Sequence, residues 1–167
     1  MSIGKIFAFD WALWFQWIMA TALGWITGLV LLTGLPLLAS GIAIGILQWL
    51  VLQRRLNQPW RWPIASAAGW AVGYLITVLI IPGELEVFNG SVLGLAAGIA
   101  QWTVLRTELR WAGWWIVFSL IGWTTGMALL PGLLSTGSLA GALTGIALDA
   151  LLRFPKDRLK RDKDLTA

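Results

Sequence analysis

The stretch GIAIGILQWLVL, residues 41–52, recurs with the same spacing as GLAAGIAQWTVL, residues 94–105. Both follow the pattern Gly-x3-Gly-x2-Gln-Trp-x-Val-Leu, and neither contains a charged residue. A third stretch, residues 141–152, keeps the two glycines and the final leucine but carries Leu148 and Asp149 in place of Gln-Trp. Each stretch lies within a longer apolar segment, which is typical of a helix that crosses a bilayer.

A second motif, Trp-x6-Gly-Trp-x2-Gly, precedes each of these stretches. It occurs as Trp17, Gly24, Trp25 and Gly28, as Trp62, Gly69, Trp70 and Gly73, and as Trp115, Gly122, Trp123 and Gly126. The threefold alternation of the two motifs indicates an internal triplication of one helical hairpin, with copies at approximately 11–56, 60–109 and 111–153. Such parallel repeats are related about an axis along the membrane normal. The hairpins either close around a threefold axis or lie in a row, and both arrangements stay open at this point.

The composition predicts that the bilayer is the main solvent of the chain. Hydrophobic residues make up 58% and charged residues only 12%, against about 25% charged residues in soluble domains. Six apolar segments are near the length that spans the hydrocarbon core. These segments are Trp11–Leu32, Leu35–Leu52, Ile64–Ile81, Phe88–Leu105, Gly113–Leu130 and Leu134–Leu152. We therefore expect an all-α, integral membrane six-helix bundle forming one domain over residues 1–167, with a basic tail at 154–167.

The basic residues predict the orientation of these segments. With six spans, all twelve lysines and arginines fall on one side, whereas the other side carries only Glu84 and Glu86. The basic residues are Lys5, Arg54, Arg55, Arg61, Arg106, Arg110, Arg153, Lys156, Arg158, Lys160, Arg161 and Lys163. Because cytoplasmic loops carry the excess of lysine and arginine, a multi-pass protein with both termini in the cytoplasm is predicted.

The spacing of the glycines predicts how the helices touch. Small residues four apart share one stripe of a helix and let two backbones approach closely in lipid. We expect this helix-packing role for Gly24, Gly28, Gly41, Gly45, Gly69, Gly73, Gly94, Gly98, Gly122, Gly126, Gly141 and Gly145.

Gln48 and Gln101 lie on these glycine stripes and have two interpretations. An interhelical hydrogen bond is the simpler one. The alternative is ligand binding, since a glutamine carbonyl can coordinate the magnesium of a chlorophyll and a glycine groove admits a flat ring or a carotenoid chain. Trp25, Trp70 and Trp123 lie deeper in their segments and are either packing wedges between hairpins or the walls of an apolar ligand groove.

Asp149 is an acid inside an apolar segment, where acids are functional candidates. Arg153 lies four residues further along, so an ion pair on one helix face is the structural interpretation. A proton or ion pathway is the functional one.

Several classes of function lack the residues they need. Cysteine and histidine are absent, which removes thiol nucleophiles, thiolate metal sites and the commonest general base. No phosphate-binding loop, dinucleotide fingerprint or nucleophile elbow is present. We expect no enzyme activity, no metal site and no required cofactor. The basic charge follows the predicted membrane topology, so no nucleic-acid partner is expected.

The segments 45–52 and 98–105, together with Trp114-Trp115-Ile116 and Gly122-Trp123, resemble uncharacterised small polytopic membrane proteins found mainly in cyanobacteria. The resemblance implies a thylakoid or plasma-membrane location and no particular activity. The first functional hypothesis is an accessory or assembly subunit of a larger membrane complex, photosynthetic complexes included, with membrane lipids and other subunits as partners. The alternatives are a small transporter or channel, which a homo-oligomer could form, and a pigment- or lipid-binding membrane protein.

Overall fold

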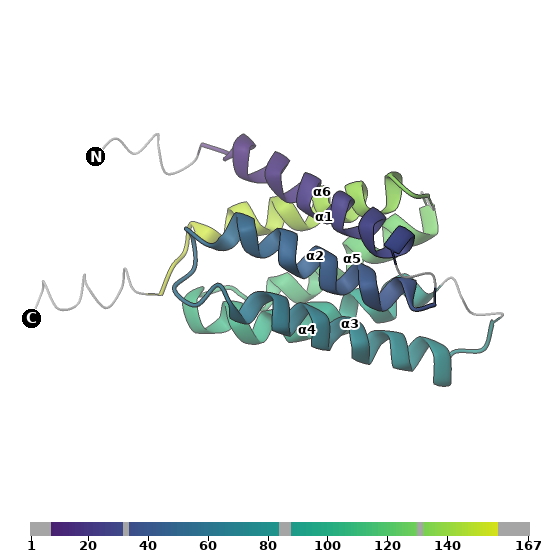
Figure 1. The fold of residues 1–167 in the computed structure, drawn as a ribbon. Helices are drawn as coiled ribbons and strands as arrows, with labels where there is room; N and C mark the ends of the chain where they lie inside the picture. The colour runs from purple at the N-terminus through teal and green to yellow at the C-terminus, as the bar shows by residue number, and fades with distance from the viewer. Residues whose placement is uncertain (1–7, 32–33, 84–87, 130–131, 157–167) are drawn as a thin grey trace, which may run out of the picture.

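The computed structural model describes residues 8–31, 34–83, 88–129 and 132–156, and it is all-helical (Figure 1). Its six helices are α1 (Trp11–Leu31), α2 (Pro36–Leu52), α3 (Arg61–Leu79), α4 (Asn89–Glu108), α5 (Trp114–Leu129) and α6 (Ser135–Leu152). The described residues form no β-strand, and Leu109 and Pro155 form an isolated antiparallel bridge. The predicted all-α class is therefore confirmed.

The six helices form a closed ring. Each helix packs against the helix before it and the helix after it, and α6 packs against α1. The start of α1 and the end of α6 lie at the same end of the bundle in Figure 1. Of the two arrangements that the sequence leaves open, the structure has the closed one.

Three helices, α1, α3 and α6, are long and apolar enough to cross a membrane. Helices α2 and α5 are also apolar but have 17 and 16 residues. The expectation of six spans is thus met by length and composition for three helices, and it stays a prediction for the others. Glu84, Glu86 and the basic residues after Lys156 lie outside the described residues.

The helices form three helix pairs, α1–α2, α3–α4 and α5–α6. Within each helix pair, glycines bring the two backbones into contact. A Cβ built on Gly28 would lie 2.0 Å from the backbone nitrogen of Ser40, and one on Gly24 would lie 2.5 Å from the Cα of Ile44. A Cβ built on Gly69 would lie 2.7 Å from the Cα of Ala97. Any side chain at these positions would force the helices apart.

The three junctions between one helix pair and the next use corresponding contacts. A Cβ on one glycine of each even-numbered helix would meet a tryptophan side chain: Gly41 with Trp70, Gly94 with Trp123, and Gly137 with Trp25. A Cβ on the next glycine would meet a small hydroxyl residue: Gly45 with Ser66, Gly98 with Ser119, and Gly141 with Thr21.

These contacts correct the alignment of the third stretch by about one helical turn. Gly137, Gly141 and Thr144 occupy the places that Gly41, Gly45 and Gln48 occupy in α2, so Thr144 replaces the glutamine. Leu148 then corresponds to Leu52 and Leu105, and all three leucines have 0% exposure. The sequence alone could not choose the register, because Gly137, Gly141 and Gly145 continue one stripe with a four-residue spacing.

Candidate functional site

The centre of the ring contains two layers of tryptophan. The first layer consists of Trp17, Trp62 and Trp115, one from each odd-numbered helix, and all three are buried. Their rings meet edge to face, with centroids 5.5 to 5.8 Å apart. This geometry places the positive edge of one ring against the negative face of the next, which is the favoured arrangement of aromatic pairs.

Trp25, Trp70 and Trp123 form the second layer, two helical turns further along. Their ring centroids are 4.8 to 6.3 Å apart, and all three side chains are buried. The three rings pack on one another, as the packing-wedge interpretation expects. Together the two layers fill the axis of the ring with six indole groups.

Gln48 joins three helices next to the first layer. Its Oε1 accepts a hydrogen bond from Nε1 of Trp62 at 3.0 Å, and its Nε2 donates one to Oγ1 of Thr21 at 3.0 Å. The amide therefore links α2 to α3 and to α1.

Gln101 repeats this arrangement one helix pair later. Its Oε1 accepts from Nε1 of Trp115 at 2.9 Å, and its Nε2 donates to Oγ of Ser66 at 2.9 Å. Both glutamines are buried and make interhelical hydrogen bonds. The ligand-binding hypothesis stays a prediction, and a ligand would have to replace two hydrogen bonds at each amide inside a packed core.

Thr144 takes the place of glutamine at the junction between α6 and α1. Its Oγ1 accepts from Nε1 of Trp17 at 3.0 Å and donates to the backbone oxygen of Ala140 at 2.7 Å. A threonine hydroxyl can donate only one hydrogen bond. Thr144 donates it to the backbone oxygen of Ala140, which belongs to the same helix. At this place the closing junction therefore has a hydroxyl that makes one interhelical hydrogen bond, where each of the other two junctions has an amide that makes two.

A cluster of charged side chains joins α1, α2 and α6 at the end of the ring that contains the α2–α3 connection. Asp149 forms the predicted ion pair with Arg153 and accepts a hydrogen bond from the backbone nitrogen of Asp10 at 3.2 Å. Asp10 in turn caps α1 through the backbone nitrogen of Leu13 at 2.9 Å and pairs with Arg55 at 3.3 Å. The contact between the two acids was not predicted, because they are far apart in the sequence.

Glu108, at the end of α4, forms hydrogen bonds with the α2–α3 connection and with Lys156, the last residue that the structure describes. Its carboxylate accepts hydrogen bonds from the backbone nitrogens of Asn57 and Gln58 at 2.9 and 3.2 Å. Its backbone oxygen accepts one from the nitrogen of Lys156 at 2.8 Å. Glu108 was not predicted as a contact residue, although an acid between Arg106 and Arg110 is a signal for it.

Each helix pair has a cleft on its outer surface, at the end of the bundle that contains the α2–α3 and α4–α5 connections. The three clefts differ in polarity. Each cleft includes the residue before a first-layer tryptophan, which is Gln16, Arg61 or Trp114. The α1–α2 cleft, of about 540 Å³, is lined mainly by polar and charged side chains. The α3–α4 cleft, of about 200 Å³, has a mixed lining, and the α5–α6 cleft, of about 220 Å³, is apolar.

A further groove of about 480 Å³ follows the outer surface of α3 and α4. Its lining is apolar and is made by Ala68, Gly69, Val72, Ile76, Val92, Leu95, Ala96, Ile99 and Ala100. The tryptophans of the second layer line none of these four cavities.

Within the part of the chain that the structure describes, no group of three or more acidic, histidine or cysteine residues is placed to hold a metal ion. No protein-family model, curated protein or solved structure matches this chain. Its function therefore has to be argued from its own geometry.

Proposed function

We propose that this chain is a multi-pass membrane protein that acts through its outer surface, as a non-enzymatic accessory or assembly subunit of a larger membrane complex. The observation that carries the proposal is the filled interior of the ring. Six indoles occupy the axis, and the buried glutamines beside them are hydrogen-bonded to neighbouring helices. Indole groups fill the axis in the described part of the chain, which favours this proposal over a channel along the axis of one chain.

The outer surface supports a membrane location. Large apolar side chains are exposed on it, among them Leu31, Leu79 and Ile80 at more than 70%. Apolar patches of this kind are rare on soluble monomers and mark contact with lipid or with a partner. The internal triplication proposed from the sequence gives each helix pair such an outer face.

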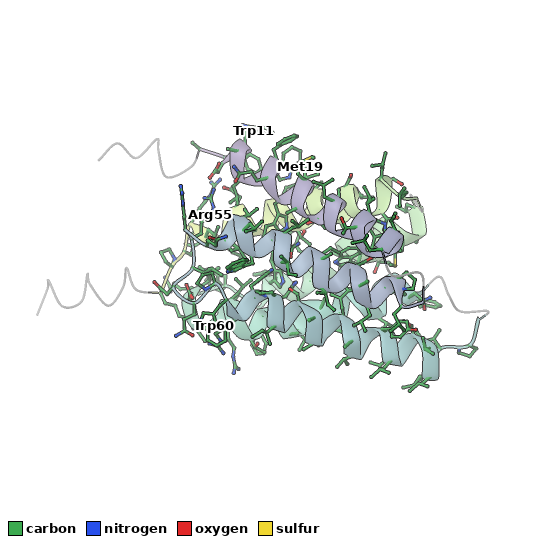
Figure 2. The ribbon with its side chains drawn as sticks, in the orientation of Figure 1. Trp11, Met19, Arg55 and Trp60 are labelled. Atoms are coloured by element: carbon green, nitrogen blue, oxygen red, sulfur yellow. The ribbon has the colours of Figure 1, made fainter. Side chains whose placement is uncertain are left out.

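The charges support the proposed orientation. Arg55 lies with Trp11 and Trp60 at one end of the bundle (Figure 2). The other described basic residues are at the same end, in the α2–α3 and α4–α5 connections, in the helix turns beside them, or at the end of α6. Under the positive-inside rule this end faces the cytoplasm, and tryptophan at the same level matches an interfacial aromatic belt.

The topology can be tested with single cysteines because the natural chain has none. Gly34, Gly83 and Gly113 are matched positions, since a Cβ at each would meet nothing within 4 Å. We expect a membrane-impermeant maleimide to label Gly34→Cys and Gly83→Cys in intact cells, and Gly113→Cys only after permeabilisation. Labelling of all three in intact cells, or recovery of the chain in the soluble fraction, would overturn the membrane proposal.

The accessory role is tested by purifying the tagged full-length chain in mild detergent. We expect other membrane subunits to co-purify in fixed proportion, and pigment–protein subunits among them would identify a photosynthetic complex. A colourless, monodisperse homo-oligomer that conducts ions in liposomes would overturn the accessory role in favour of a channel.

Binding of a lipid or pigment is a second proposal, and the apolar groove along α3 and α4 favours it. Its lining of small and branched apolar side chains offers an apolar surface to an acyl or polyene chain. Ala96→Leu narrows the groove, whereas Ala128→Leu makes the same change at an exposed position on α5. We expect bound pigment absorbance or lipid to decrease in the first variant alone. Equal retention in both variants would contradict this proposal.

A further inference from the structure

The α1–α2 cleft contains polar groups that have no partner in the protein. Gln16, Gln53 and Arg54 line it, and none of their side chains forms a hydrogen bond or ion pair with another described residue. Gln48 and Gln101, in contrast, use both ends of their amides. These three unpaired side chains therefore share one cavity on the outside of the ring.

Gln16 is unusual for its position on α1. It is exposed on a face that otherwise presents Phe15, Met19 and Leu23 outward, and Figure 2 shows Met19 on that outer side. At a rise of 1.5 Å per residue, Gln16 lies about 7.5 Å from the start of the helix. In the proposed membrane this is the level of the lipid headgroup and glycerol, where an unpaired amide needs a polar partner.

Arg54 supplies an unpaired positive charge to the same cavity. The neighbouring Arg55 is paired with Asp10 at 3.3 Å, so its charge is already balanced in part. A guanidinium presents a planar fork of donors that matches two oxygens of a phosphate. Leu50 and Val51 continue the wall of the cleft along α2 and present an apolar surface beside this group.

The corresponding clefts of the other two helix pairs lack this combination. Arg61 stands in the place of Gln16 in the α3–α4 cleft, where it hydrogen-bonds to Gln58 at 3.3 Å. Trp114 stands in that place in the α5–α6 cleft, which Trp111 and Phe154 complete with apolar surface. An unpaired cation and two unpaired amides meet in the α1–α2 cleft and in neither of the others.

We propose that the α1–α2 cleft binds the headgroup of an anionic phospholipid. Arg54 binds the phosphate, Gln16 and Gln53 donate hydrogen bonds to phosphate or glycerol oxygens, and the first part of an acyl chain lies on Leu50 and Val51. The inference rests on the proposed membrane location. It does not depend on the accessory role.

The test uses the full-length chain in detergent and native mass spectrometry, with phosphatidylglycerol or phosphatidylcholine added at equal concentration. The variant Arg54→Gln with Gln16→Leu removes the site, and Arg110→Gln removes one charge at the same end. We expect the unmodified chain and Arg110→Gln to retain phosphatidylglycerol in preference to phosphatidylcholine. The double variant should lose this preference by about tenfold, the size expected for a charge-assisted hydrogen bond.

Three results would overturn the inference. The double variant could keep the preference, or Arg110→Gln could lose it equally, which would indicate a diffuse attraction to surface charge. Soluble glycerol phosphate could bind as tightly as the lipid, which would make a free phosphate compound the ligand. Both altered side chains are exposed, so folding is checked by the elution profile, and Arg54→Lys should restore part of the preference.

The two proposals fail in different ways. Absence of the chain from the membrane fraction would overturn the membrane location and the lipid site together. A membrane-integrated chain without any preference for phosphatidylglycerol would overturn the lipid site alone.

Discussion

The junction between α6 and α1 differs from the other two junctions between helix pairs. At α2–α3 and α4–α5 the chain itself connects the helices, and a glutamine hydrogen-bonds across the junction. At α6–α1 no connection exists, and Thr144 makes the link to Trp17. The charged cluster of Asp10, Asp149 and Arg153 lies at this junction. The comparison shows that the junction without a covalent connection has a charged cluster in addition to the glycine packing that all three junctions share.

The first tryptophan layer is shared by all three junctions, so its loss should have the largest effect. Trp115→Ala removes two edge-to-face ring contacts and leaves the Oε1 of Gln101 without its donor. We expect the free energy of unfolding to decrease by about 3–5 kcal/mol, measured by circular dichroism during denaturation in mixed micelles. The neighbouring Trp114 is exposed, and Trp114→Ala should cost about 1 kcal/mol or less. Equal losses would show that the layer does not hold the ring together.

The charged cluster should matter at the closing junction in particular. Asp149→Asn keeps an oxygen for the backbone nitrogen of Asp10 but leaves Arg153 without its counter-ion. The side chains of Asp149 and Arg153 are 7% and 25% exposed, so we expect a loss of about 2 kcal/mol, which is below the cost of breaking a fully buried pair because Arg153 is in part solvated. Thermal unfolding in detergent measures the change.

Arg55→Gln is the control for the charged cluster. It breaks the more exposed pair with Asp10 and should cost less than about 1 kcal/mol. A larger loss in Arg55→Gln than in Asp149→Asn would contradict the expectation that the less exposed pair contributes more to the stability of this junction.

The smallest expected difference in the free energy of unfolding is between the loss of the glutamine link at α2–α3 and the loss of the threonine link at α6–α1. Gln48→Leu removes two interhelical hydrogen bonds, whereas Thr144→Val removes one. Single interhelical hydrogen bonds in membrane proteins average about 0.6 kcal/mol. We therefore expect Gln48→Leu to cost about twice as much as Thr144→Val in the same denaturation measurement. The opposite order would show that the threonine link is the stronger one.

Much of this structure could be predicted from local patterns. The apolar segments predict the six helices, although α3 begins at Arg61 rather than at Ile64, because the arginine and tryptophan before the apolar run continue the helix. The four-residue spacing of Asp149 and Arg153 predicts their ion pair. These features depend on residues within a few turns of one another, and helix geometry alone relates such residues.

The three-dimensional relations between distant segments could not be predicted in this way. The two tryptophan layers, the hydrogen bond between Asp10 and Asp149, and the three outer clefts each combine residues from different helices. The register of α6 belongs to this group as well. Glycine at 137, 141 and 145 gives one continuous stripe, and only packing against Thr21 and Trp25 of α1 selects the register.

The order of the residues is enough to specify a helical, apolar chain with glycine and tryptophan at helical spacing. The closed ring, the place of Thr144 at the closing junction, and the meeting of Gln16, Gln53 and Arg54 in the α1–α2 cleft follow only from the folded arrangement. Periodicity specifies which face of a helix carries the small and apolar residues that pack against another helix. Which other face it meets depends on the packing of all six helices together.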